Sequence, residues 1–395
     1  MSATDATIPT AADAQARPWR RAAIWLAALA PLFYLTYGSA NWLASLRTDV
    51  PSIVFAWERS IPFLDWTIIP YWSINAFYGW SLFVCATKDE LDTHGRRLLT
   101  AQLVAVACFI LFPLRFTFAQ PETHGVAGFL FAALTSFDKP FNQAPSLHIA
   151  LLVILWVLYA RHVPRWALWL LHPWFLLVGV SVLTTYQHHV IDIPTGALLG
   201  FLCLWLWPDR GPSPLSAFHV ALDRRRLVLA SRYGAGAAVI GALALIGGGA
   251  ALWLLWPAIS LAMVAANYAF FGPTGFQKRQ DGGMTLAACV LLAPYLAAAW
   301  INSRLWTRKQ PAPVIVADGV ALGRLPDRAV AAGFSTVIDL CAELPRPPGQ
   351  AAVGPGQWRA FPTLDLVAPE PDLLRAAAAP RCGCSGRRSR WRWWP

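Results

Sequence analysis

The chain has 395 residues, of which 56% are hydrophobic and 13% are charged, and its mean hydropathy is +0.45. Apolar runs long enough to cross a hydrocarbon core, about 20 residues each, recur along it, which excludes a soluble protein of two or three domains. The net charge of +11 does not indicate a nucleic-acid partner, because Lys and Arg gather beside the apolar runs. We therefore expect an all-α polytopic protein in the lipid bilayer of a bacterial inner (plasma) membrane.

Residues 1–21 are expected to form a disordered cytoplasmic N-terminus. Arg17, Arg20 and Arg21 precede the first apolar run. That run has no convincing signal-peptide cleavage site and continues past Tyr37, so we interpret it as a retained helix.

Six apolar segments predict a six-helix membrane domain over residues 22–207. They lie at about 22–42, 66–86, 98–118, 145–160, 166–184 and 187–207. The fourth segment is short, so its outer end, near Ser146 and His148, is expected to line a protein cavity.

Basic residues mark every second connection between these segments. They are Arg17, Arg20 and Arg21; Lys88, Arg96 and Arg97; Arg161 and Arg165; and Arg210, Arg224, Arg225 and Arg226. Since cytoplasmic loops carry an excess of Lys and Arg, this side is predicted to be cytoplasmic, and loops 43–65 and 119–144 face the periplasm or exterior.

A basic cytoplasmic loop at 208–235 leads to accessory transmembrane helices over 236–303. Pro257 divides a long apolar run into a predicted hairpin, and a further span covers about 284–302. If three spans follow the first six, Lys278 is cytoplasmic but Arg304, Arg308 and Lys309 are outside. If two spans follow, Lys278 is outside and the other three residues are cytoplasmic.

From residue 310 onward the composition is that of an incomplete soluble α/β segment, 310–395. Residues 314–317 are predicted to form a strand, 327–332 a short helix, and 335–340 a buried strand. The end of the chain is rich in Arg, Trp, Cys and Gly and has no periodicity.

Three polar clusters occupy the predicted outer ends of the third, fourth and sixth segments. They contain Arg115 in FPLRF; Lys139, Ser146 and His148 in DKPFNQAPSLH; and Thr184, Gln187, His188 and Asp192 in TTYQHHVID. Ionisable groups at membrane depth are costly and usually functional. The loop charges alone place all three clusters on one side, which predicts a joint site.

The spacing of His188 and Asp192 predicts that both lie on one face of a helix. Asp192 could then accept a hydrogen bond from one ring nitrogen of His188, leaving the other free to attack phosphorus. Arg115 could bind a phosphate through two charge-assisted hydrogen bonds, with Ser146 and Lys139 on the remaining oxygens.

His148 is the candidate general acid for the leaving alcohol, and Thr184 and Gln187 are further phosphate-binding candidates. No cluster of carboxylates is available to hold Mg²⁺, so we expect metal-free catalysis without a cofactor. Taken alone, His148 could be an interfacial histidine and Arg115 a snorkelling anchor. His189 is interpreted as interfacial, because it points about 100° away from His188 on a helix.

These residues resemble the type-2 phosphatidic acid phosphatase superfamily, the lipid phosphate phosphatases, over roughly residues 100–207. The similarity is greatest to the branch with inositol phosphorylceramide synthases, which share the P-S-L-H form. The family motifs P-S-G-H and S-R-x5-H-x3-D imply that His148 is the acid, His188 the nucleophile and Asp192 its orienting partner. Val182 replaces the arginine of the last motif, and the first motif is reduced to Arg115, so the phosphate site is less cationic than in the family.

The C-terminal segment resembles the start of a dual-specificity protein phosphatase domain, through VADGVALGRLP, STVIDLCAE and FPTLDLVAP. Such domains need C-x5-R between a buried strand and a helix, and the acid would be Asp365. Cys382 and Arg388 have this spacing, but no apolar strand precedes Cys382. We therefore expect a truncated and catalytically silent segment.

The sequence thus predicts a membrane phosphatase that hydrolyses a lipid phosphate or pyrophosphate ester through a phosphohistidine. One alternative is a phosphotransferase that uses the same site to move a phospho-alcohol head group between lipids. Another, from a different class, is a transporter or scaffold with a degenerate site. Internal repeats would favour a transporter, and none is visible. The oligomeric state is left open.

Overall fold

The computed structural model describes residues 17–317, 319–347, 358–369 and 371–378. Within them the fold is mainly helical, and five helices are long and apolar enough to cross a membrane. These are Trp19–Ser45, Lys88–Leu111, Arg165–Thr184, Arg224–Gly247 and Gly249–Phe276. The expectation of a helical membrane protein therefore agrees with their length and composition.

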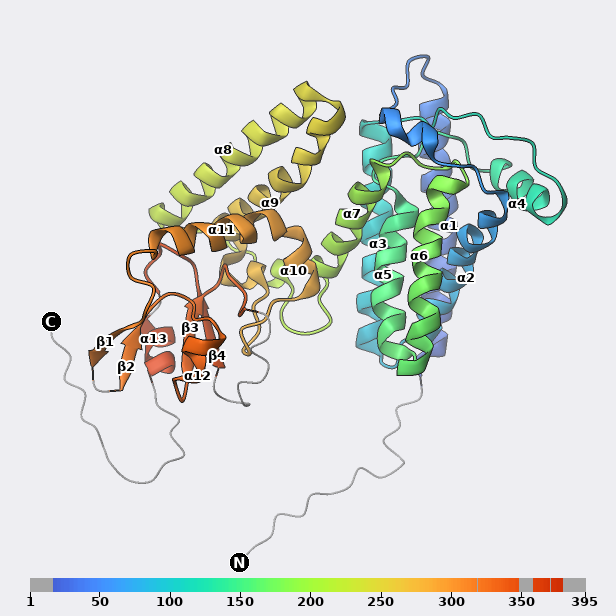
Figure 1. The fold of residues 1–395 in the computed structure, drawn as a ribbon. Coiled ribbons are helices and arrows are strands. Elements are labelled where there is room, and N and C mark those ends of the chain that lie inside the picture. The colour runs from blue at the N-terminus through green and yellow to red at the C-terminus, as the bar shows by residue number, and fades with distance from the viewer. Residues whose placement is uncertain (1–16, 318, 348–357, 370, 379–395) are drawn as a thin grey trace, which may run out of the picture.

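The first part of the chain forms a helical bundle with one helix, α5, at its centre. Its helices are α1 (Trp19–Ser45), α2 (Ile68–Val84), α3 (Lys88–Leu111), α5 (Leu147–His162), α6 (Leu168–Thr184) and α7 (Asp192–Leu206). Figure 1 shows α1, α2, α3, α5 and α6 side by side. One apolar core joins α5 to α1, α3 and α7, and a second joins it to α2 and α6. The short α4 (Gly125–Thr135) lies in the connection before α5 and contacts α2.

The third helix begins and ends earlier than predicted. Thr87 caps it by accepting a hydrogen bond from the Glu90 backbone N–H, and acidic residues follow in the first turn, where the helix dipole favours them. Arg97, predicted in a cytoplasmic connection, is therefore inside α3. It is buried, donates to the backbone oxygen of Trp207 and pairs with Asp209 at 2.9 Å. Because α3 ends at Leu111, Arg115 lies beyond its C-terminal end.

A hairpin of α8 (Arg224–Gly247) and α9 (Leu255–Ala266) follows the bundle. Its turn lies at 248–254 and not at Pro257, because Gly248 and Gly249 adopt positive φ values of 55° and 45°. Pro257 sits in the first turn of α9, where a missing N–H is tolerated. The predicted basic loop is shorter than 208–235, since Asp223 caps α8.

The predicted span at 284–302 is two short helices, α10 (Leu286–Leu291) and α11 (Ala293–Trp306), with Pro294 at the break. Lys278 pairs with Asp339 at 2.6 Å, and Arg304 donates to the Leu325 oxygen at 3.1 Å. Both basic residues thus contact the C-terminal segment and lie at the same end of the hairpin. This differs from both predicted arrangements, which separated them.

The C-terminal segment begins with the antiparallel hairpin of β1 (Val314–Ala317) and β2 (Val320–Leu322). Helix α12 (Arg328–Ala332), capped by Asp327, precedes β3 (Val337–Cys341), which pairs in parallel with β4 (Trp358–Thr363), and α13 (Pro371–Ala378) follows. The first strand and the short helix are confirmed. The C-terminal segment lies at the same end of the molecule as the start of α1 (Figure 1).

The expectation that 335–340 is a buried strand was wrong in one respect. In β3 the apolar Ile338 and Leu340 are 49% and 37% exposed, whereas Asp339 is buried. Asp339 is the residue that turns inward because its carboxylate pairs with Lys278. Cys382 and Arg388 lie outside the described residues.

We predict that cysteines introduced at Ser216 and Lys309 lie on the opposite membrane face from one at Glu122. In intact cells an impermeant thiol reagent should label Glu122→Cys above the level of the parent chain, and the other two variants only after permeabilisation. Equal labelling of Lys309→Cys and Glu122→Cys would show that 286–306 crosses the membrane after all.

Candidate active site

Two glycines bring α7 into backbone contact with α5. A Cβ atom on Gly196 would lie 2.5 Å from the backbone oxygen of Ser146, and one on Gly200 would lie 2.8 Å from that of Ala150. Small residues four apart allow membrane helices to approach this closely. The contact also lets the Ser146 N–H donate to the backbone oxygen of Asp192 at 3.2 Å. The first residues of α5 and α7 are therefore neighbours.

A chain of hydrogen bonds links three predicted site residues at this junction. Ser146 Oγ is 3.1 Å from His188 Nε2, and His188 Nδ1 is 3.1 Å from Asp192 Oδ2. All three side chains are buried, and Asp192 Oδ1 has no hydrogen-bond partner among the described residues. The buried carboxylate can hold one ring nitrogen of His188 and stabilise the cationic imidazole.

His188 and Asp192 do not share a helix face as predicted. Helix α6 ends at Thr184, Tyr186 adopts a positive φ of 55°, and the His188 N–H donates to the Val182 oxygen at 3.0 Å. Asp192 opens α7. Its carboxylate turns back over the loop because it also accepts the N–H of His189 at 3.0 Å. The predicted contact of His188 with Asp192 is therefore present. It joins a loop residue to the first residue of α7, and not two residues on one face of a helix.

A cavity of about 290 Å³ opens beside His188. Its lining includes three residues singled out from the sequence: Lys139, Gln187 and His188. The Lys139 ammonium is 3.3 Å from Ser45 Oγ, and the Gln187 backbone oxygen accepts from Gln143. Aromatic side chains supply much of the remaining wall, from Tyr37, Tyr71, Phe116, Phe118 and Tyr186.

Three predicted phosphate ligands are not in the lining of this cavity: Arg115, Thr184 and the buried Ser146, which contacts His188. Arg115 is exposed in the extended segment after α3, where its backbone N–H bonds to the Pro51 oxygen. Thr184 is buried, and its hydroxyl is 2.8 Å from that of Thr67. Thr184 therefore joins α6 to the segment before α2.

His148 lies in the first turn of α5, behind the cavity wall. Its ring stacks on Tyr71, with centroids 4.3 Å apart and an interplanar angle of 21°. Its Nε2 atom is buried and has no hydrogen-bond partner among the described residues. Buried polar atoms nearly always have a hydrogen-bond partner. The unpaired Nε2 of His148, separated from the cavity by the Tyr71 ring, is therefore a candidate donor to a bound ligand.

Glu58 is a buried residue of this junction that was not predicted, and the interpretation of His189 as interfacial was wrong. His189 is buried, its Nδ1 is 2.9 Å from Glu58 Oε2, and its Nε2 is 3.2 Å from the Thr117 hydroxyl. Glu58 also accepts the backbone N–H groups of Phe55 and Val190. This pair ties loop 43–65 to the His188 loop. Nothing in the sequence distinguished Glu58, because the same loop also contains Arg47, Asp49, Arg59 and Asp65.

Asp138 is a second residue that the sequence analysis missed. Its carboxylate lines the cavity and accepts hydrogen bonds from the Tyr37 hydroxyl and the Asn41 amide, both at 3.1 Å. Burial raises the pKa of this carboxyl, and hydrogen bonds from the neighbouring side chains oppose the shift. Asp138 and Lys139 both line the cavity, so the net charge of the cavity depends on whether Asp138 is protonated.

In the part of the chain that the structure describes, no group of three His, Cys, Asp or Glu side chains is placed to hold a metal ion. Comparison with models of protein families, with curated proteins and with solved structures finds no match to this chain. The site geometry and the motif resemblance are therefore the basis of the functional proposal.

We predict that Gly196→Ala separates Ser146 from His188. The new Cβ would lie 2.5 Å from a backbone oxygen, so α7 must move away from α5, and overpacking of this kind costs roughly 1–3 kcal/mol. The thermal midpoint should fall, and turnover should drop by on the order of 100-fold if the groups shift by about 1 Å.

Gly79→Ala on α2 is the matched control, because a Cβ there meets nothing within 4 Å. It should leave both properties unchanged or raise stability slightly, since Ala is a better helix former than Gly. Wild-type turnover in Gly196→Ala would contradict a site that depends on the contact of α5 with α7.

Proposed function

We propose that the chain is a membrane enzyme that hydrolyses phosphate monoesters or pyrophosphates of lipids through a phosphohistidine at His188. The observation that carries this proposal is the buried hydrogen-bonded series Ser146–His188–Asp192 beside a cavity. An orienting carboxylate on one ring nitrogen leaves the other as a nucleophile, which is how histidine is activated for covalent catalysis. The motif resemblance gives independent support.

In the proposed reaction, His188 Nε2 attacks phosphorus as the bond to the lipid oxygen breaks. Asp192 stabilises the positive charge on the ring while the P–N bond forms. His148 donates its proton to the departing alkoxide and then removes one from the water that cleaves the P–N bond. For this step the ligand must reach the unpaired His148 Nε2, which requires displacement of the Tyr71 ring.

Charge in the cavity favours a ligand with few negative charges. Lys139 is the one cation among the described residues that line it, and Asp138 is the opposing acid. A phosphoryl group gains most from fixed positive groups, so a single lysine is a weak cradle for a dianion. The Gln187 amide would supply a neutral donor in the cavity, and the buried Ser146 hydroxyl, 3.1 Å from His188 Nε2, would supply one beside the attacking nitrogen.

The same site would act as a phosphotransferase on a phosphodiester lipid if His188 took up the phospho-alcohol head group as the lipid alcohol left, and a second lipid alcohol replaced water in the last step. Product analysis separates the two reactions, since hydrolysis of a monoester releases inorganic phosphate whereas this transfer forms a new phosphodiester. If neither product forms from a panel of lipid phosphates, the transporter or scaffold alternative is favoured.

One distance favours a second candidate function, that of a serine hydrolase. Ser146 Oγ, His188 and Asp192 have the connectivity of a serine nucleophile, its base and its orienting acid. However, Ser146 is buried and its oxygen already accepts the Ile149 N–H as the cap of α5. We therefore assign the hydroxyl to binding and the imidazole to attack.

We predict that His188→Ala abolishes the acid-labile phosphoenzyme formed with a radiolabelled lipid phosphate and lowers turnover by on the order of 10⁴-fold or more. Ser146→Ala should retain the labelled intermediate and lose about 100-fold or less, the effect of removing one donor to phosphate oxygens.

His148→Ala should also retain the intermediate when the leaving group is a good one, because only the acid is lost. A label that persists in His188→Ala but disappears in Ser146→Ala would identify Ser146 as the nucleophile. Fluorophosphonate labelling that depends on Ser146 would support the hydrolase candidate in the same way.

We predict that Asp138 sets a pH dependence of substrate binding. Its raised pKa means that the carboxyl is neutral at lower pH and gains a negative charge as pH rises through that pKa, repelling the substrate. KM should therefore increase with pH by about tenfold, the equivalent of one pKa unit of interaction. Asp138→Asn should abolish this rise.

Glu122→Gln is the control, because this acid is exposed in the outer loop and does not line the cavity. Its KM profile should match that of the wild type. An unchanged profile in Asp138→Asn would mean that the substrate phosphate lies elsewhere.

A further inference from the structure

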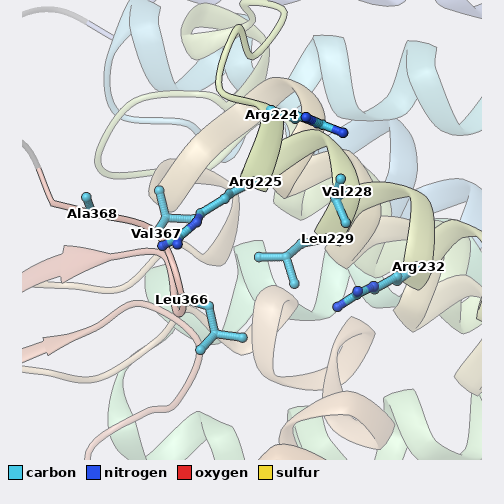
Figure 2. A pocket seen from close by; sticks show the side chains of 8 residues that line it. All are labelled: Arg224, Arg225, Val228, Leu229, Arg232, Leu366, Val367 and Ala368. Carbon is cyan, nitrogen blue, oxygen red and sulfur yellow. The ribbon is translucent and has the colours of Figure 1, made fainter.

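A second cavity, of about 700 Å³, lies at the opposite end of the membrane helices from His188. It forms between the first two turns of α8 and the segment after β4. Its lining residues are Arg224, Arg225, Val228, Leu229, Arg232, Leu366, Val367 and Ala368. Figure 2 shows Arg225 and Arg232 extending toward the segment that carries Leu366 and Val367, with Leu229 between them.

Among the described residues, the arginines of this cavity have no charge partner. No carboxylate among the described residues pairs with Arg224, Arg225 or Arg232. By contrast, the neighbouring Arg226 is held by the backbone oxygen of Tyr268 at 3.1 Å. Uncompensated guanidinium groups that line a hollow indicate an anion, and arginine binds phosphate through paired hydrogen bonds.

The apolar residues indicate what the anion is attached to. Val228 and Leu229 form part of the wall beside the arginines. Farther along α8, the helix face that carries Arg232 continues as Val239, Leu243 and Ile246, which are 60%, 56% and 85% exposed. A stripe of this kind on a membrane-length helix faces acyl chains, which places the arginines at the depth of lipid head groups.

We propose that this cavity binds the phosphodiester head group of an anionic phospholipid, with one acyl chain along Val239, Leu243 and Ile246. Arg225 and Arg232 bind the phosphate, and the apolar segment at Leu366 and Val367 covers its glycerol. The lipid thereby connects α8 to the C-terminal segment. Basic pockets at membrane helix ends are suited to this ligand. The inference is independent of the chemistry at His188.

The test is equilibrium binding of a fluorescent short-chain phosphatidylglycerol to the full chain in neutral detergent. Arg225→Gln/Arg232→Gln should weaken binding by about 25-fold, since one basic side chain near an anionic lipid contributes roughly fivefold. The control Arg20→Gln/Arg210→Gln removes two exposed arginines at the same end of the molecule and should change binding less than twofold. Equal loss in both double variants would overturn the proposal, because it indicates diffuse charge attraction.

A second variant tests whether binding needs the open space of the cavity as well as its arginines. Ala368→Trp keeps all three arginines but fills the hollow, and it should weaken binding as strongly as the double variant; wild-type affinity there would overturn the proposal. Phosphatidylcholine should compete poorly. Glycerol phosphate or inorganic phosphate that competes as well as the lipid would show a free-anion site instead. Retained binding in His188→Ala is expected, and its loss would place the lipid in the other cavity.

Discussion

The close approach of α7 to α5 is the constraint on which the rest of the site depends. Helix α5 is buried on most of its circumference, between one core shared with α1, α3 and α7 and another shared with α2 and α6. Gly196 and Gly200 allow α7 to pack on it at backbone distance. Ser146, the N-cap of α5, and Asp192, the first residue of α7, then both contact His188. A side chain positioned by two helix starts is fixed more firmly than one on a free loop.

Buried charge around this junction is arranged in pairs. Asp192 holds His188, and Glu58 holds His189, the next residue in the chain. Burying an ionisable group without a partner is costly, so each acid restricts where its histidine can lie. The second pair also holds loop 43–65 against the His188 loop. The two histidines thus differ in environment: one borders the cavity, and the other stacks on Phe116 and contacts Phe118 edge-on.

The helical membrane character and the grouping of Ser146, His188 and Asp192 could be predicted because apolar length, loop charge and motif spacing are local properties of the chain. The position of Arg115 could not, because it depends on where α3 ends and how the following segment pairs with Pro51. Glu58 and Asp138 were missed since their partners are distant in sequence. The break at Pro294 converted a predicted span into two helices. The lipid-phosphatase assignment itself remains a proposal.

The burial of Lys278 depends on residues that are synthesised after it. Its ammonium is fully buried and bonds to the Asp339 carboxylate and to the backbone oxygens of Cys341 and Leu344, all of which lie in the C-terminal segment. Removing one partner of a buried pair costs about 3–5 kcal/mol. While the ribosome is still translating residues beyond Lys278, this lysine has none of its partners. The loop after α9 therefore reaches its final conformation only when β3 has emerged, and the membrane part and the C-terminal segment mature as one unit.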